Sequence, residues 1–308
     1  MDFVTVCFSD DLPQMQVQAA SMERYLRKFP VDNIIVVIND EDYAACERYF
    51  RERVMPMYGF LQDFVKLVNG DTLVNPMYRY YNQMLLKLVT AKLVSAEHYC
   101  ILDAKNFLAA HWTEADVFDS ERRLKAKYLP LMDQWDQGCK RSFELFGLDY
   151  TQYPKVSQHT PFFAHSEIVQ SMINRPDFED TFKKQMLVEF PLIQAATIAC
   201  YGDFESAYWI TDDDHNDKAK FKTRYNPGIW QIDCEHINRN NNLEWYLLWT
   251  EAKILAAGVH RSCFLHLSEH NIAALKHIWM KLKIVDQRQA DVIVSEMQDR
   301  NREKILSG

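Results

Sequence analysis

Glycine is scarce in this sequence, with 8 among 308 residues. Loops that hold phosphate groups often depend on glycine, because its backbone can approach a ligand closely. Residues 9–14, which follow the first predicted strand, contain neither glycine nor a basic side chain. This excludes a glycine-marked phosphate loop at that place, so a phosphate site would have to use other side chains.

Cysteine is also sparse, and its spacing does not match a structural metal site. The seven cysteines are scattered, and no two of them form a CxxC pair. The nearest cluster, Cys234, Glu235 and His236, lacks the ligand spacing of a zinc site. An odd number of scattered cysteines indicates free thiols in a reducing compartment.

Long apolar runs and an excess of basic residues are missing as well. No stretch approaches the ~20 apolar residues of a membrane span, and the first residues have neither the basic nor the apolar part of a signal peptide. The formal net charge of -8 argues against a nucleic-acid partner. We therefore expect a cytoplasmic protein without a transmembrane segment, with peripheral attachment at the inner membrane face as a variant of this location.

The first third of the chain alternates between short apolar runs and amphipathic stretches. Strands are predicted at residues 4–8, 34–38 and 99–102, and helices at 15–29, 42–53 and 81–94. Such alternation is typical of an α/β fold with a mainly parallel sheet flanked by helices.

Polar residues follow each of the three predicted strands. These are Ser9 and Asp10, Asn39, and Asp103. Because the carboxyl ends of parallel strands meet at one edge of a sheet, and ligands of open α/β sheets bind there, the pattern predicts a nucleotide-sized site at this edge.

The second half is predicted to be rich in helices. Glu189 stands in an apolar run two residues before Pro191, which we expect to interrupt a long helix. Gly138 is expected to break a helical region, and Gly258 to end a helix over residues 243–257. The tail from Gln287 is charged and without an evident core face.

One stretch resembles a known family. The order Gln83-x-x-x-Lys87-Leu, followed by Tyr99-x-x-Leu-Asp103, is similar to the core of GT-A glycosyltransferases. In particular it resembles an uncharacterised bacterial group of nucleotide-diphospho-sugar transferase-like proteins (DUF6492-like). The wider class ends this strand in Asp-x-Asp, whose carboxylates hold a divalent metal. Here Lys105 stands in place of the second carboxylate.

The resemblance implies a GT-A-like, Rossmann-type fold over residues 1–308. Residues 1–110 would form the nucleotide-binding half, 111–285 the acceptor-side half, and 286–308 a charged tail. The implied activity is transfer of a sugar from a nucleotide-sugar donor to a glycan or lipid-linked acceptor in bacterial surface polysaccharide synthesis.

Two arrangements for the donor's diphosphate remain open at this stage. Asp103 binds Mn²⁺ or Mg²⁺ with help from Asn106 or His260, because hard cations take oxygen ligands and manganese accepts imidazole. Alternatively Lys105 contacts the phosphates directly and no metal is used. The His260-Arg261 pair also resembles that bacterial group, which implies that both residues contact the diphosphate, and arginine suits bidentate phosphate contact.

Further residues are assigned to the donor, to the acceptor and to proton transfer. Gln83 and Lys87 share a helix face and are predicted to reach the nucleotide or diphosphate. Burial raises the pKa of a carboxylate toward neutral pH, which makes Glu189 the candidate general base for an inverting transfer. Weaker acceptor-site candidates are His159, Thr160 and Trp230.

Three other functions remain open. A nucleotidyltransferase would use a similar sheet but usually carries the glycine-rich loop that is lacking here. A non-catalytic sugar- or nucleotide-binding scaffold is favoured by the lysine at position 105. A metal-dependent hydrolase would use the acidic residues 212–217, which form an Asp-Asp-Asp-His-Asn-Asp run.

Overall fold

A five-stranded sheet forms the centre of the molecule in the computed structural model, which describes residues 1–76, 79–128, 135–210, 230–232, 255–259, 261, 264 and 267–307. Its strands are β1 (Asp2–Cys7), β2 (Asn33–Ile38), β3 (Val65–Asn69), β4 (His98–Asp103) and β7 (Phe162–His165), in the spatial order β3-β2-β1-β4-β7. The first four are parallel, and β7 pairs with β4 in the antiparallel sense. The predicted α/β class is confirmed.

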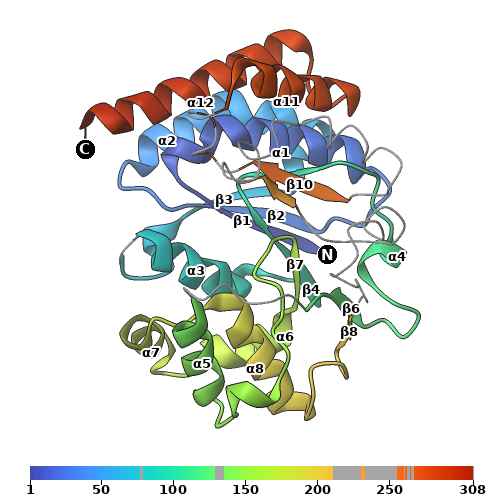
Figure 1. Ribbon diagram of the computed structural model, residues 1–308, viewed down its shortest axis with the longest axis vertical. Coiled ribbons are helices and arrows are strands. Elements are labelled where there is room, and N and C mark those ends of the chain that lie inside the picture. Colours follow the sequence, from blue (N-terminus) through green and yellow to red (C-terminus); the bar gives the residue numbers. More distant parts are fainter. Residues whose placement is uncertain are drawn as a thin grey trace.

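Helices cover both faces of this sheet (Figure 1). One face carries α1 (Leu12–Tyr25), α2 (Tyr43–Tyr49), α11 (Glu269–Lys281) and α12 (Gln287–Ser307). The other carries α3 (Arg79–Val89), α5 (Asp136–Glu144), α6 (Ser166–Ile173), α7 (Phe178–Gln185) and α8 (Glu189–Tyr201). Strands β1, β2 and β4 are almost completely buried, as continuous apolar runs between two helical layers require.

Two smaller sheets and several short turns of helix complete the fold. The three-stranded sheet has the order β5 (Asn106–Leu108), β10 (Ala256–Val259), β9 (Trp230–Ile232), and β6 (Leu124–Ala126) pairs with β8 (Tyr208–Ile210). The short helical elements are η1 (Ser9–Asp11), η2 (Phe50–Val54), η3 (Met55–Phe64), η4 (Gly70–Thr72), η5 (Thr90–Leu93), α4 (Glu114–Val117) and η7 (Tyr150–Gln152). Strand β5 begins three residues after Asp103, so this second sheet starts at the edge where the site was predicted.

Both glycine-based helix predictions are wrong. Gly138 lies inside α5, where an added Cβ would stand 2.6 Å from Val188 Cγ2. Gly258 lies in strand β10, where an added Cβ would stand 2.9 Å from Asn106 Nδ2. In both places glycine permits a close approach between elements, and it does not end a helix.

The prediction that the C-terminal tail lacks a core face is wrong. The tail follows α11, which Ser268 caps, with its Oγ accepting a hydrogen bond from the Asn271 backbone N–H. The charged tail is helical, but it does have a core face. In α12 the side chains of Ala290, Ile293, Val294 and Met297 are buried. Their three- and four-residue spacing is the helical period, and it packs α12 against α1 and α11.

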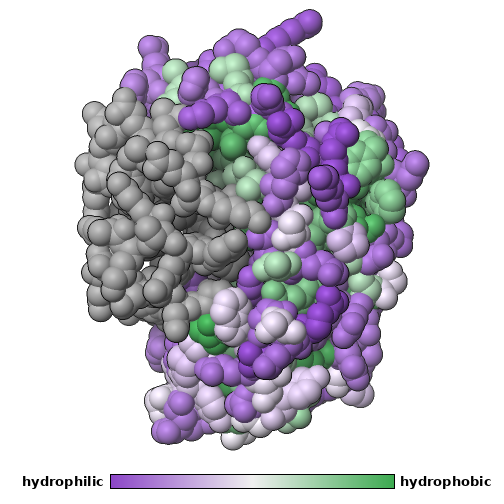
Figure 2. All heavy atoms as spheres, turned by 90° about the vertical axis from the view of Figure 1, so that its right-hand side faces the viewer, coloured by the Kyte–Doolittle hydropathy of each residue, from purple (hydrophilic) through white to green (hydrophobic). Residues whose placement is uncertain are grey.

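The surface mixes hydrophilic and hydrophobic residues on the face shown in Figure 2, with hydrophilic residues predominating at its top. Large apolar side chains that are exposed in the described chain include Phe60, Tyr80 and Trp209. Among the described helices, none is both long and apolar enough to cross a bilayer.

Candidate functional site

The polar residues that follow β1, β2 and β4 come together at one edge of the sheet, as predicted. The Ser9 backbone N–H donates to Asp40 Oδ2 at 3.1 Å, which joins the ends of β1 and β2. Val6 of β1 pairs with Asp103 of β4, so the ends of these neighbouring strands also lie side by side. Ser9 and Asp10 form the short helix η1 at this edge.

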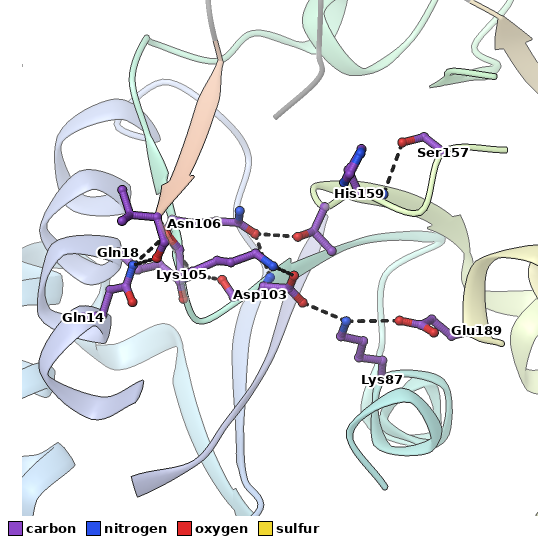
Figure 3. Close-up of polar contacts among 11 residues, drawn as sticks. Gln14, Gln18, Lys87, Asp103, Lys105, Asn106, Ser157, His159 and Glu189 are labelled. Atoms are coloured by element: carbon purple, nitrogen blue, oxygen red, sulfur yellow. Dashed lines mark hydrogen bonds and ion pairs between the residues drawn. The ribbon is translucent and has the colours of Figure 1, made fainter. Parts of the chain in front are cut away.

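Four charged side chains form a cluster at the end of β4 (Figure 3). Lys87 Nζ lies 2.7 Å from Asp103 Oδ1 and 3.2 Å from Glu189 Oε1. Lys105 Nζ lies 2.9 Å from Asp103 Oδ2. We call Lys87, Asp103, Lys105 and Glu189 the charge cluster. It unites residues that the sequence assigned separately to the metal, the diphosphate and the base.

Burial and these ion pairs act in opposite directions on the pKa values of Asp103 and Lys87. Burial alone would raise the pKa of the Asp103 carboxyl, but the ammonium groups of Lys105 and Lys87 outweigh it and hold this pKa well below its usual range. Burial alone would lower the pKa of Lys87, but Asp103 and Glu189 outweigh it and raise this pKa. Asp103 and Lys87 therefore remain charged across the neutral range.

Helix α1 positions the turn that carries Asp103, Lys105 and Asn106. Gln18 Nε2 donates to the backbone oxygen of Asp103 at 2.8 Å and to that of Asn106 at 3.2 Å. Gln14 Nε2 donates to the Lys105 oxygen at 3.2 Å. The sequence interpretation missed both glutamines, although two glutamines four residues apart on the apolar face of a helix were the available signal.

Asn106 closes this turn through its own side chain. Its Oδ1 accepts hydrogen bonds from the Asp103 backbone N–H at 2.7 Å and from Thr160 Oγ1 at 2.8 Å. Asn106 is buried, and this amide oxygen is engaged by donors. The residue therefore shapes the loop, and the same oxygen is a poor ligand for a metal ion.

Glu189 reaches the cluster because α8 begins with it. Pro191 lies in the first turn of α8, where its missing N–H breaks no helical hydrogen bond. The expected interruption of a longer helix is therefore wrong, and the proline marks the start of the helix instead. The position also suits a carboxylate, since the N-terminal end of a helix favours negative charge.

Asn39 lies at the end of β2 and is linked to α3. Asn82 Nδ2 donates to Asn39 Oδ1 at 2.7 Å, and both side chains are buried. Within the described residues, Asn39 Nδ2 is a buried donor that makes no hydrogen bond. Gln83, also on α3, lies one turn before Lys87 and is partly buried.

Arg261 lies at the end of β1. Its Nη1 is 3.1 Å from Asp11 Oδ1 and 3.7 Å from Asp10 Oδ2, and its guanidinium stands 5.5 Å from the centre of the Phe8 ring. Burial, opposed by Arg261, raises the pKa of Asp11. His260 and the acidic run 212–217 lie outside the described residues, so their predicted roles stay predictions.

His159 lies beside the charge cluster (Figure 3). Burial, followed by the charge of Lys105, lowers the pKa of its imidazole. Its backbone N–H donates to Ser157 Oγ at 3.2 Å. The imidazole therefore favours the neutral form, and its predicted contact with the acceptor stays a prediction.

The ion pairs of the charge cluster occupy the carboxylates that a divalent cation would need. Both carboxylate oxygens of Asp103 already face ammonium groups, and Glu189 faces Lys87. Within the described chain, no group of three or more His, Cys, Asp or Glu side chains is placed to hold a metal ion. A divalent ion at Asp103 would have to displace Lys105 or Lys87 from its partner.

Comparison with known proteins identifies the family. A family of unknown function, DUF6492, matches residues 5–195, which is more than half of the chain. The chain belongs to this family. A search of curated proteins finds no match to this DUF6492 chain.

Glycosyltransferases are among the solved structures similar to this DUF6492 chain. A galactosyltransferase, LgtC, solved with donor and acceptor sugar analogs, has a TM-score of 0.52 and 10% identity, over 94% of this chain and 98% of its own. The glycosyltransferase GlyE of Streptococcus pneumoniae TIGR4 has a TM-score of 0.46 and 12% identity, over 97% of this chain and 63% of its own. The predicted GT-A fold is confirmed.

Proposed function

We propose that the protein is a glycosyltransferase that moves a sugar from a nucleotide-sugar donor to a glycan or lipid-linked acceptor of surface polysaccharide synthesis. The observation that carries the proposal is the charge cluster, which stands at the carboxyl end of β4 in a GT-A fold. Ligands of open α/β sheets bind at this edge. The galactosyltransferase with a similar fold was solved with donor and acceptor sugar analogs, which supports the same class of ligands here.

The donor's nucleoside would lie at the ends of β1 and β2. Ser9, Asp10 and Asn39 line this part of the edge. The buried Nδ2 donor of Asn39 fits an oxygen or nitrogen acceptor of a base or ribose, since a buried donor without a partner costs about 1–3 kcal/mol. The diphosphate would then reach toward Lys105.

Glu189 is our candidate for the general base. Lys87 lies between Glu189 and Asp103 (Figure 3). It therefore holds the Glu189 carboxylate beside the position proposed for the diphosphate. In the proposed reaction the acceptor oxygen bonds to the anomeric carbon while its proton passes to Glu189. The bond from that carbon to the diphosphate oxygen breaks, and its electron pair leaves with the nucleoside diphosphate.

A binding protein without catalytic activity is the second candidate. The observation in its favour is Lys105, which replaces a carboxylate that the wider GT-A class uses for a metal. Both functions predict that nucleoside diphosphates bind. They differ in whether a bound nucleotide sugar is turned over.

Turnover of nucleotide sugars tests the proposal. Release of UDP, GDP or CDP from the corresponding nucleotide sugars is measured with the wild type, with Glu189→Gln and with Glu167→Gln. Glu167 is exposed on α6 and serves as the matched control. We expect Glu189→Gln to lose about 100-fold or more in turnover, in the range of a lost general base, while binding of the nucleoside diphosphate persists.

The outcomes separate the candidate functions. Release of nucleoside diphosphate that depends on Glu189 but not on Glu167 supports the transferase. Binding without turnover of any nucleotide sugar supports the binding protein. Pyrophosphate release from a nucleoside triphosphate and a sugar 1-phosphate would support a nucleotidyltransferase.

A further inference from the structure

The charge cluster bears on how a leaving diphosphate is neutralised. In the GT-A class this task falls to a divalent cation on two carboxylates. In this chain Lys105 occupies the position of the second carboxylate, and its ammonium lies 2.9 Å from Asp103 Oδ2. The chain therefore carries a fixed cation beside the carboxylate that would hold the metal.

Lys87 faces the second oxygen of the Asp103 carboxylate, so neither oxygen is free to bind a metal ion. Its ammonium lies 2.7 Å from Asp103 Oδ1 and 3.2 Å from Glu189 Oε1. Its side chain is 6% exposed, against 14% for Lys105. Lys87 is thus enclosed by the two acids that it faces, while the Lys105 side chain is the more exposed of the two lysines and the better placed to contact a ligand.

Lys105 is also held in position by its surroundings. Gln14 of α1 donates to its backbone oxygen, and the Asn106 side chain closes the turn around it. Gly258 of β10 lies so near that an added Cβ would stand 3.3 Å from Lys105 Cγ. A donor fixed in this way loses little freedom when it binds an anion, which is the condition for electrostatic stabilisation of a leaving group.

We propose that Lys105 takes the place of the divalent ion. It binds the donor's diphosphate directly and neutralises the nucleoside diphosphate as it leaves, so that donor binding and transfer need no metal. This inference rests on the proposed glycosyltransferase function. The bond changes are those of the transfer described above, and the negative charge that develops on the diphosphate oxygen is met by the Lys105 ammonium.

Calorimetric titration with UDP, GDP, CDP and pyrophosphate tests the inference, each in EDTA and each with Mn²⁺. The protein is compared with Lys105→Met, Lys105→Arg and Lys105→Asp, and with Lys92→Met as the control for loss of an exposed lysine. Lys105→Asp restores an Asp-x-Asp sequence from Asp103 onward. Circular dichroism of each variant verifies that it is folded.

We expect the wild type to bind its preferred nucleoside diphosphate equally well in EDTA and in Mn²⁺. Lys105→Met should bind about tenfold more weakly in EDTA, as the loss of one charged hydrogen bond predicts. Lys105→Arg and Lys92→Met should keep metal-free binding. Lys105→Asp should bind in Mn²⁺ but not in EDTA.

Two results would overturn the inference about Lys105, and only the second would also overturn the proposed glycosyltransferase function. If EDTA weakens wild-type binding about tenfold and Mn²⁺ restores it, the site uses a metal and the glycosyltransferase proposal stands. If no nucleoside diphosphate binds under either condition, both proposals are wrong.

Discussion

Lys87 is the member of the charge cluster whose removal should change stability most. It is buried, and it is the cation that faces both Asp103 and Glu189. At an effective dielectric constant of about 20, contacts of this length are each worth roughly 5–6 kcal/mol before the cost of removing the ions from water. Replacement of Lys87 by Met, which keeps much of the side-chain length, leaves buried negative charge without this partner.

The expected loss in the free energy of unfolding is about 3–5 kcal/mol, the usual cost of breaking a buried ion pair by removing one partner. This corresponds to a fall in Tm of roughly 10 °C for a protein of this size. Chemical denaturation followed by circular dichroism measures the change. Lys92→Met, at an exposed position on η5, is the matched control and should stay within about 0.5 kcal/mol of the wild type.

Two further results would show that charge causes the loss. Glu189→Gln added to Lys87→Met should recover part of the stability, because it removes one unpaired charge. The deficit of Lys87→Met should also shrink as the pH falls from neutral, because a buried unpaired carboxylate takes up a proton more readily than it does in the unfolded chain. A Lys87→Met variant as stable as the wild type would show that the ion pairs of Lys87 do not stabilise the fold.

Two other predictions concern the site and its surroundings. Gly258→Ala places a Cβ 2.9 Å from Asn106 Nδ2 and 3.3 Å from Lys105 Cγ. It should therefore weaken nucleoside diphosphate binding roughly tenfold in calorimetric titration. Unchanged affinity would show that the close approach of Gly258 is unimportant for the ligand. Burial, followed by the neighbouring His165, lowers the pKa of His98 from 6.5 to about 4. The unfolded chain therefore binds a proton at higher pH than the folded one, and stability should be full above about pH 6.5 and fall as the pH is lowered toward 4. Urea denaturation across this range should show a weaker pH dependence in His98→Asn, and an identical dependence would exclude His98 as its source.

The parts of the fold that the sequence predicted are those with strong local patterns. Strands β1, β2 and β4 are short apolar runs, and α3 shows helical spacing of its apolar residues. The polar residues at the strand ends indicated the edge at which the charge cluster lies, because all parallel strands end on one edge. Strand β3 was not predicted, since its residues are only partly buried and its apolar pattern is weaker.

Contacts between segments far apart in the chain could not be predicted from the sequence. Lys87 and Glu189 are 102 residues apart, and nothing local indicates that they meet. Gly258 was interpreted as a helix end because glycine is common there, whereas its role is to let β10 approach Asn106 and Lys105. Pro191 was interpreted as an interruption, although a proline suits the first turn of a helix equally well.

Direct binding of the diphosphate by Lys105 is tested most directly by a crystal structure of the protein with the nucleoside diphosphate that it binds most tightly. We expect the nucleoside to lie at the ends of β1 and β2. We also expect a diphosphate oxygen within hydrogen-bonding distance, about 3 Å, of Lys105 Nζ. A nucleotide bound away from this edge, or one whose diphosphate contacts neither Lys105 nor the rest of the charge cluster, would contradict this expectation.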